Sequence, residues 1–467
     1  MRLNNFTKKN YIEIEKLFKI ILKHYKKISN KGIDRNKNLV GFFFHDLMFY
    51  FASLQYQKNL KKNNRLRFGY RNNFFLFKKH KKNRNSQFIY KVYNLFSKLL
   101  FHKTLYFGYG IKLSLAQKIY LVLLSSLNGY RIELINNLSN RADFENFNFQ
   151  KKILYSLIKY LSKYYKLSKK DKSQLNIDVN IFIKKIISKK KIISMNNNKV
   201  LIGSSANIFN RIAATQQDSK ISSNIIFGHE NHTGFTNNLH LRFNEFQYAD
   251  RYVCNGISDK RLLKNSINYY NLQNKFPRLI HRGLRNKVSN LTIDGKIEKI
   301  SELKGLYIPT RIELDVINSA ECINHLDYQK WQNFLLSHNK NIFIKPHPKQ
   351  TYKIEKIQKR KIVNGNLSEV IKDFDYLIFD FVSSAAFGEV VTSNKQIIYF
   401  NIGLSSFTDI GKKLFFKRVH KIDVDLENKF EGYRNFHKTE LSGKTNEFSQ
   451  YFCNSESNFS FINKIFL

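Results

Sequence analysis

Residues 341–348 read Asn-Ile-Phe-Ile-Lys-Pro-His-Pro, an apolar run that ends in a histidine held between two prolines. The whole chain of 467 residues has only four prolines, so this pair calls for a physical reason. Proline cannot donate to a sheet ladder or continue a helix, so we expect a buried strand that stops at Pro346. Pro348 also pushes His347 towards extended geometry. The stretch therefore predicts an imidazole at the carboxyl end of a strand, where open α/β sheets bind ligands.

Short apolar runs of this kind recur after residue 198, and each is followed by small or polar residues and then by a helical pattern. Strands that alternate with helices indicate βαβ units and parallel sheets. The polar span 286–301 reads as a linker between two sets of such units. The expected strands are 199–202, 224–227, 251–254, 305–308, 341–344, 376–379 and 396–400.

The first 195 residues are basic, and their apolar pattern is mostly helical. Residues 39–44 read Leu-Val-Gly-Phe-Phe-Phe and predict a buried strand, which we expect to be the first strand of the N-terminal sheet. A chain of this length is expected to fold into two or three domains. The expected division is a helical region 1–195, Rossmann-like units at 196–290 and 300–425, and a tail at 426–467.

The charge balance is strongly basic, with 80 Lys and Arg against 35 Asp and Glu and a net charge of +45. Such a field attracts nucleic acid, anionic lipid, nucleotides or acidic glycans. An AT-rich coding sequence is an alternative source of the charge, since Lys, Asn, Ile, Phe and Tyr are all abundant. The three cysteines are far apart and fit a reducing compartment. With no apolar stretch of about 18 residues, the sequence predicts a cytoplasmic protein whose basic surface can contact the inner face of a membrane.

Two serines follow the expected strand 376–379. Ser384 is placed to cap a helix, and the first amides of a helix together with Ser383 and Ser384 suit a phosphate group. His347 follows the preceding strand, so parallel neighbours would bring it to the same rim, with Lys345 close in sequence. Together these residues predict a diphosphate site. The alternatives are serines that only cap a helix and a histidine that only packs in the core.

A second group of polar residues follows the strand 224–227. His229, Glu230 and His232 lie within four residues, and an imidazole there could act as general base towards an acceptor hydroxyl. A metal site is a rival interpretation that needs a third ligand from elsewhere, because the spacing is not that of a zinc protease. A solvated loop without function is the third reading. We expect neither a metal nor a cofactor.

Four segments resemble a known family. Residues 306–311 (Leu-Tyr-Ile-Pro-Thr-Arg) resemble the opening of the C-terminal domain in CDP-glycerol glycerophosphotransferases. Residues 345–348 resemble their His-Pro motif, which capsule polysaccharide transferases and bacterial sialyl- and polysialyltransferases share. Residues 375–384 resemble their Asp-x-x-x-x-Asp-[Tyr/Phe]-x-Ser-Ser segment, and residues 249–256 resemble the Ala-Asp strand that ends the N-terminal half. The resemblance covers roughly residues 200–405.

The resemblance implies a GT-B architecture, with two Rossmann-like parallel-sheet domains that face a cleft and a helical N-terminal region. The unit at 300–425 would bind the nucleotide donor, and the unit at 196–290 would lie on the acceptor side. His347, Ser383 and Ser384 would hold the donor phosphates. The family's candidate base is a histidine in a His-Gly pair, to which His229 and His232 are the nearest equivalents. The remaining residues expected on the donor side are Lys345, Thr310, Arg311 and Glu389.

The implied activity is a transferase of surface polysaccharide synthesis. It would move a sugar or polyol phosphate from a nucleotide-activated donor, a cytidine nucleotide, to a glycan or polyol-phosphate acceptor. A nucleic-acid-binding protein is the alternative from another class, suggested by the net charge and by Arg-Leu-Arg-Phe-Gly-Tyr at 65–70. The even spread of charge along the chain and the lack of a recognised motif argue against it. A non-catalytic scaffold of envelope assembly is a further alternative.

Overall fold

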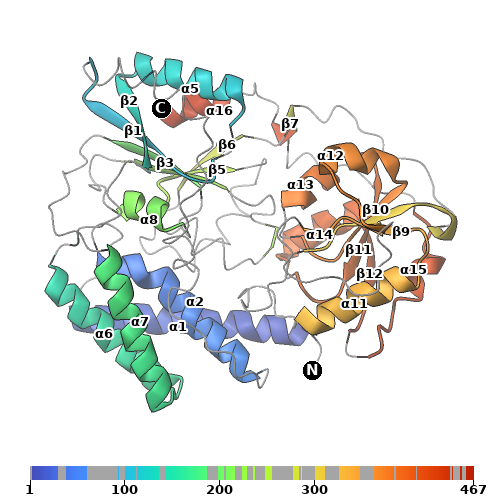
Figure 1. Cartoon of the computed structure of the whole chain (residues 1–467), viewed down its shortest axis with the longest axis horizontal. Coiled ribbons are helices and arrows are strands. Elements are labelled where there is room, and N and C mark those ends of the chain that lie inside the picture. Colours follow the sequence, from blue (N-terminus) through green and yellow to red (C-terminus); the bar gives the residue numbers. More distant parts are fainter. Residues whose placement is uncertain are drawn as a thin grey trace.

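Two parallel β-sheets organise the chain, and they lie side by side in Figure 1. The structure is a computed structural model of the 467-residue chain. It describes residues 3–29, 38–59, 93, 100–111, 113–135, 144, 146–186, 198–203, 207–215, 223–228, 235–236, 248–254, 277–282, 285–286, 300–310, 325–347, 361–382, 385–405, 407–426, 428–441, 444, 453–454 and 459–467.

The first sheet has six parallel strands in the order β2-β1-β3-β4-β5-β6. The chain adds β2 on one side of β1 and then crosses to the other side for β3 and the strands after it. The winding therefore reverses between β1 and β3, which is the topological switch point of a doubly wound sheet. The strands are β1 (Lys103–Phe107), β2 (Tyr130–Leu134), β3 (Lys199–Ile202), β4 (Ser223–Phe227), β5 (Arg251–Cys254) and β6 (Arg278–His281).

The second sheet has five parallel strands in the order β12-β11-β10-β8-β9. Here the winding reverses between β8 and β10. The strands are β8 (Gly305–Tyr307), β9 (Ile342–Ile344), β10 (Tyr376–Phe379), β11 (Gln396–Asn401) and β12 (His420–Asp423). A short pair, β7 (Arg285–Asn286) and β13 (Cys453–Asn454), forms a separate two-stranded sheet.

The predicted fold class, α/β with two Rossmann-like parallel sheets and helices at the N-terminus, is confirmed. All seven strands expected after residue 198 are present within one residue of their expected bounds. Of the strands in the two large sheets, the sequence missed β1, β2, β6 and β12. Three of these, β2, β6 and β12, are edge strands of their sheets. An edge strand is less completely buried, so it lacks the continuous apolar run that marks a central parallel strand.

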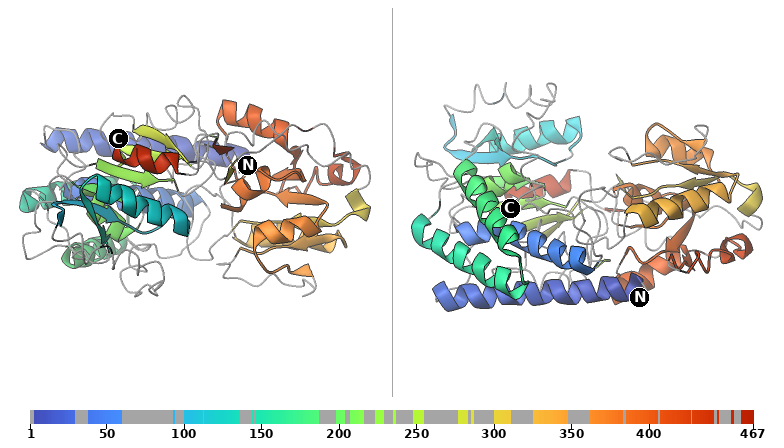
Figure 2. Two further views of the ribbon diagram at one scale, coloured as in Figure 1. Left: turned by 90° about the horizontal axis from the view of Figure 1, so that it is seen from above. Right: turned by 60° about the horizontal axis from the view of Figure 1, so that its bottom comes forward.

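Helices cover both faces of each sheet, which is why the central strands are apolar throughout (Figure 2). On the first sheet, α5 (Leu115–Leu127) and α16 (Ser460–Phe466) pack on one face and α8 (Ile208–Thr215) on the other. On the second sheet, α11 (His325–Ser337) and α15 (Asn435–Lys438) share a face. The opposite face is covered by α12 (Leu367–Val370), α13 (Ala385–Val391) and α14 (Asp409–Arg418). Single 3₁₀ turns occur at Ile300–Glu302 and Ile371–Asp373.

A layer of four helices lies beyond α8, on the side of the first sheet opposite to α5 (Figure 1). It consists of α1 (Leu3–Ser29), α2 (Leu39–Asn59), α6 (Phe147–Tyr164) and α7 (Lys169–Ile186), which share one hydrophobic core. Among the described residues, no helix is both long and apolar enough to span a membrane.

The expected strand at 39–44 is wrong, because these residues form the first turns of α2. All six residues in this run are buried, and a fully buried helix and a fully buried strand give the same continuous apolar signal. Asn38 favours the helix because it satisfies amides of the first turn. Its side-chain oxygen accepts a hydrogen bond from the Gly41 amide (2.9 Å), and its backbone carbonyl accepts one from the Phe42 amide (2.9 Å). The region 1–195 is also less purely helical than expected, since β1 and β2 lie within it.

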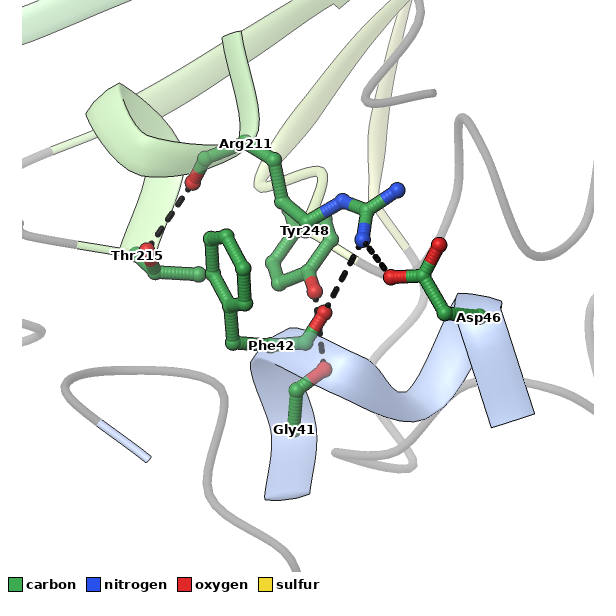
Figure 3. A network of polar contacts seen from close by, with 6 residues as sticks. All are labelled: Gly41, Phe42, Asp46, Arg211, Thr215 and Tyr248. Atoms are coloured by element: carbon green, nitrogen blue, oxygen red, sulfur yellow. Dashed lines mark hydrogen bonds and ion pairs between the residues drawn. The ribbon is translucent and has the colours of Figure 1, made fainter. Parts of the chain in front are cut away.

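A buried ion pair fixes this helical layer to the first sheet (Figure 3). Arg211 of α8 is fully buried, and its Nη1 lies 2.6 Å from Oδ2 of Asp46 on α2. The same nitrogen donates to the Phe42 carbonyl (3.1 Å), and the Tyr248 hydroxyl donates to the Gly41 carbonyl (2.8 Å). Helix α8 is the next helix after β3, so it begins near the carboxyl edge of the first sheet. These contacts therefore connect α2 to that edge.

The C-terminal segment returns to the first sheet. Lys199, at the start of β3, donates from Nζ to the carbonyls of Ile465 (2.7 Å) and Phe466 (3.0 Å) at the end of α16. Arg251, at the start of β5, donates to the Lys464 carbonyl (3.0 Å). Two cations thus bind the unpaired carbonyls at this helix end, where positive charge is favoured.

Candidate functional site

The carboxyl edge of the second sheet gathers the residues that follow β8, β9 and β10. Thr310 and His347 each lie three residues beyond the end of their strand, and Asp380 directly follows β10. The winding reverses between β8 and β10, and open α/β sheets bind ligands outside the carboxyl ends at such a switch point. This edge is therefore the candidate site.

The expectation that β9 and β10 are neighbours is wrong, because β8 lies between them. A βαβ unit can be added on either side of the strand it starts from, and strand spacing in sequence does not say which. His347 and the residues after β10 still share one edge of the sheet, but they are two strand spacings, about 10 Å, apart. A ligand that contacts both must extend across the end of β8.

His347 is held by the main chain that precedes it. The Lys345 amide donates to the Tyr307 carbonyl (2.9 Å), so the ladder between β8 and β9 continues to this point and then stops at Pro346. His347 itself is partly exposed. The Lys345 ammonium donates to the Gly365 carbonyl (2.6 Å), which joins the end of β9 to the segment that precedes α12.

The other expected site residues divide into two groups. Thr310 is buried at the carboxyl edge, whereas Glu389 is exposed on α13, one turn into that helix. The expected residues that lie outside the described part of the chain are His229, His232, Arg311, Ser383 and Ser384.

Asp380, the second aspartate of the segment 375–384, is the central polar group of this edge. Its carboxylate is fully buried and accepts from three side chains. The Tyr328 hydroxyl donates to Oδ1 (2.9 Å), the Trp331 indole donates to Oδ2 (3.1 Å), and the Tyr307 hydroxyl also donates to Oδ2. A signal was present in the sequence, since an aspartate directly after four apolar strand residues must find buried donors.

These hydrogen bonds connect the ends of two strands to a helix. Tyr307 is the last residue of β8, Asp380 follows β10, and Tyr328 and Trp331 lie on α11. The Tyr328 hydroxyl also accepts from the Thr310 amide (3.0 Å), so the chain beyond β8 is held by the same cluster. Burial raises the pKa of the Asp380 carboxyl to about 6, although the three donors oppose the shift. Asp380 therefore joins the carboxyl ends of β8 and β10, the two strands that flank the switch point, to α11.

At the switch point of the first sheet, the chain beyond β1 is hydrogen-bonded to α8 and to the chain beyond β3. The Asn210 side chain accepts from the Tyr109 amide (2.9 Å) and donates to the Tyr109 carbonyl (3.0 Å). The Gly203 amide donates to the same carbonyl (2.9 Å), and a Cβ on Gly203 would lie 2.7 Å from that oxygen. Glycine is required at Gly203 because the two loops approach so closely.

A segment that follows β4 connects the two sheets. Gly228 is held by the Val253 carbonyl (2.9 Å), and a Cβ there would lie 2.5 Å from the Tyr252 hydroxyl. Seven residues later, Phe235 is buried in the core of the second sheet. Its carbonyl accepts from the amide (3.0 Å) and hydroxyl (3.2 Å) of Thr408, and Thr236 forms an antiparallel bridge with Phe407. The chain between these two anchors carries the candidate bases.

We expect Gly411→Ala to break this connection. A Cβ on Gly411, in the first turn of α14, would lie 2.1 Å from the Phe235 carbonyl oxygen. Overpacking of this kind costs about 1–3 kcal/mol, whereas helix propensity alone predicts a gain of up to about 1 kcal/mol for this change. Urea unfolding would measure the difference. The exposed neighbour Lys412→Ala is the control and should stay within about 0.5 kcal/mol. A more stable Gly411→Ala variant would contradict the contact.

Among the described residues, no group of three or more His, Cys, Asp or Glu side chains is placed to hold a metal ion.

Known proteins resemble this chain in structure but not in sequence. No protein-family model matches the sequence, and no curated protein matches it significantly. Among solved structures, the chain is similar to the wall teichoic acid polymerase TagF, solved as a histidine-to-asparagine variant. The match covers 81% of this chain and 92% of that one, with a TM-score of 0.34 and 11% sequence identity. The architecture rests on the two parallel sheets themselves.

Proposed function

We propose that the protein is a transferase of surface polysaccharide synthesis. It moves a sugar or polyol phosphate from a nucleotide-activated donor, a cytidine nucleotide, to a hydroxyl of a glycan or polyol-phosphate acceptor. The observation that carries the proposal is the carboxyl edge of the second sheet, where Thr310, His347 and Asp380 follow three strands at a switch point. The motifs around these residues, which resemble those of CDP-glycerol glycerophosphotransferases, support it.

In this proposal the second sheet binds the donor. His347 donates a hydrogen bond to a phosphate oxygen, and Ser383 and Ser384 bind the same diphosphate from beyond β10. Asp380 does not touch the donor, because its carboxylate is buried and occupied by Tyr307, Tyr328 and Trp331. It holds the loops in place, so that the donors to the phosphate need not reorganise during the reaction.

The first sheet provides the acceptor side. One imidazole, His229 or His232, accepts the proton of the acceptor hydroxyl while the oxygen of that hydroxyl forms a bond to the transferred group. The bond to the leaving nucleotide breaks in the same displacement, and its electron pair stays on the nucleotide phosphate, where His347 and the serines stabilise the charge. Both histidines lie between Gly228 of the first sheet and Phe235 in the core of the second, a connection that would keep the base near the donor.

Calorimetric titration with CMP, CDP, UDP and GDP tests the donor site. We expect the cytidine nucleotides to bind best and His347→Ala to weaken their binding about 10- to 100-fold, the cost of a hydrogen bond to a charged group. His338→Ala is the matched control: this exposed histidine lies between α11 and β9, at the amino end of the strand, and bonds to the Phe334 carbonyl. The His338→Ala variant should bind the nucleotides as tightly as wild type.

Two outcomes would contradict the assignment. One is a wild-type protein that binds none of the four nucleotides. The other is binding that is indifferent to both His347→Ala and Ser384→Ala. Turnover with His229→Ala and His232→Ala then tests the base: one of the two should lose turnover and keep its nucleotide affinity. Full turnover in both variants would show that neither histidine is the base.

A further inference from the structure

The main chain of Tyr109 is fixed at the carboxyl edge of the first sheet by three hydrogen bonds. Tyr109 lies two residues beyond β1, at the switch point between β1 and β3. Its amide and its carbonyl both bond to the side chain of Asn210, which is only 1% exposed. The carbonyl also accepts from the Gly203 amide. A buried polar side chain and a second loop thus hold one residue where open α/β sheets bind ligands.

Three glycines make this position possible. A Cβ on Gly108 would lie 2.5 Å from Oδ1 of Asn210, the atom that accepts from the Tyr109 amide. A Cβ on Gly203 would meet the Tyr109 carbonyl oxygen. Gly110 has a φ of 83°, in the left-handed region that residues with a side chain rarely adopt. Main chain that is constrained in this way is typical of functional sites.

The Tyr109 ring remains partly exposed at this edge. It packs on Phe209 of α8, with ring centres 5.8 Å apart, and both rings lie against the hydrophobic core of the first sheet. The described residues that directly follow β1, β2 and β3, at positions 108–111, 135 and 203, carry no charge. What Tyr109 offers to a ligand is therefore an aromatic ring with a hydroxyl, supported from behind by a second ring.

We propose that Tyr109 binds a sugar ring of the acceptor. This inference rests on the proposed transferase function and narrows its acceptor to a glycan. One face of a pyranose is a patch of C–H groups that packs on an aromatic ring, and its hydroxyls suit a phenol that can donate and accept. A polyol phosphate has no ring, and it carries a negative charge for which the described residues directly beyond these strands provide no cation.

The order of the strands relates this ring to the candidate bases. Tyr109 follows β1, and the segment that carries His229 and His232 follows β4, with β3 between the two strands. The carboxyl ends of β1 and β4 are therefore two strand spacings, about 10 Å, apart. A glycan bound on Tyr109 would cross the end of β3 to present its hydroxyl to a base beyond β4.

A microarray of defined oligosaccharides and glycerol phosphate oligomers tests the inference. We expect wild type to bind a subset of the oligosaccharides. Tyr109→Leu keeps apolar bulk against Phe209 but lacks the flat ring, so it should bind them about tenfold more weakly. Tyr109→Phe keeps the ring and should stay within about threefold of wild type. The matched control is Tyr164→Leu, which removes a tyrosine of α6 that is 49% exposed and should bind like wild type.

A second pair of variants leaves the Tyr109 side chain in place. Gly110→Ala strains the main chain next to Tyr109, whereas Gly129→Ala places the same kind of strain between α5 and β2, at the opposite end of the strands. Both variants should lose a similar amount of stability in urea unfolding. Only Gly110→Ala should also lose oligosaccharide binding, to about the level of Tyr109→Leu. Equal binding by the two alanine variants would contradict a positioned ring.

Calorimetry with CDP on the same variants separates this inference from the proposed function, because the donor binds to the second sheet. Tyr109→Leu should bind CDP like wild type. If wild type binds CDP but no oligosaccharide, or if oligosaccharide binding is indifferent to Tyr109→Leu, the inference fails while the donor site stands. Binding of glycerol phosphate oligomers alone would also overturn it. A wild type that binds oligosaccharides through Tyr109 but no nucleotide would support the sugar site and contradict the transferase.

Discussion

Replacing Asp46 with asparagine should destabilise the protein by about 3–5 kcal/mol, the cost of leaving one buried charge without its partner. Arg211 is fully buried, and the Asp46 side chain is only 4% exposed, so water cannot replace the lost carboxylate. The neighbouring Phe42 carbonyl satisfies one hydrogen bond but not the charge. Chemical denaturation at neutral pH would measure the loss.

Two comparisons separate the ion pair from a general effect of mutation. Asp327→Asn breaks a pair with Lys330 that is largely exposed, so it should cost less than about 1 kcal/mol. The double variant Asp46→Leu/Arg211→Met replaces the charges with apolar groups and should regain most of the lost stability. If Asp46→Asn costs as little as Asp327→Asn, the helical layer is not fixed to the first sheet by this pair.

Replacing Asp380 with alanine should have the second large effect, because it removes the carboxylate that accepts from three buried donors. The Tyr307 hydroxyl can still donate to the Tyr328 hydroxyl (3.3 Å). Each buried group left unsatisfied costs about 1–3 kcal/mol, so we expect a loss of at least about 2 kcal/mol. The loops beyond β8 and β10 should also lose their fixed positions, and nucleotide binding should weaken more than tenfold. Denaturation and calorimetry measure the two effects separately.

The control for Asp380 lies at the other end of the same strand. Asp375 precedes β10, and its carboxylate accepts one exposed hydrogen bond, from the Lys304 amide (2.8 Å). Asp375→Ala should therefore cost about 1 kcal/mol and leave nucleotide binding intact. Equal losses of binding in the two variants would contradict a specific positioning role for Asp380.

The buried carboxyl also gives a pH dependence with a definite sign. Burial raises the pKa of Asp380 from 3.8 to about 6, so the folded protein holds this proton more tightly than the unfolded chain. The resulting stability is fully present below pH 4 and is lost as the pH rises through 6, by about 3 kcal/mol for about two pKa units. The stability of wild type relative to Asp380→Asn should fall across this window. A flat difference would mean that the pKa is not raised.

Much of the second sheet could be predicted from the sequence. Its central strands are short, apolar and bounded by polar residues, and the prolines around His347 mark the end of β9. These signals are local, so they can be read from the sequence without knowing which strands are adjacent in the sheet. The candidate site was predicted less completely. His347 and Thr310 lie at the expected edge, but Asp380 acquires its role only from Tyr307, Tyr328 and Trp331, which are up to 73 residues away.

The sequence by itself determined where seven of the strands after residue 198 begin and end, to within one residue, and that they are parallel, because burial on both faces leaves a continuous apolar run. Tertiary structure alone decided the order of those strands, since β8 could have β9 or β10 on either side. It also decided that residues 39–44 form a helix, because α2 is surrounded by α1, α6 and α8 rather than by other strands. The same holds for α16, whose attachment depends on two cations more than 200 residues away, Lys199 and Arg251.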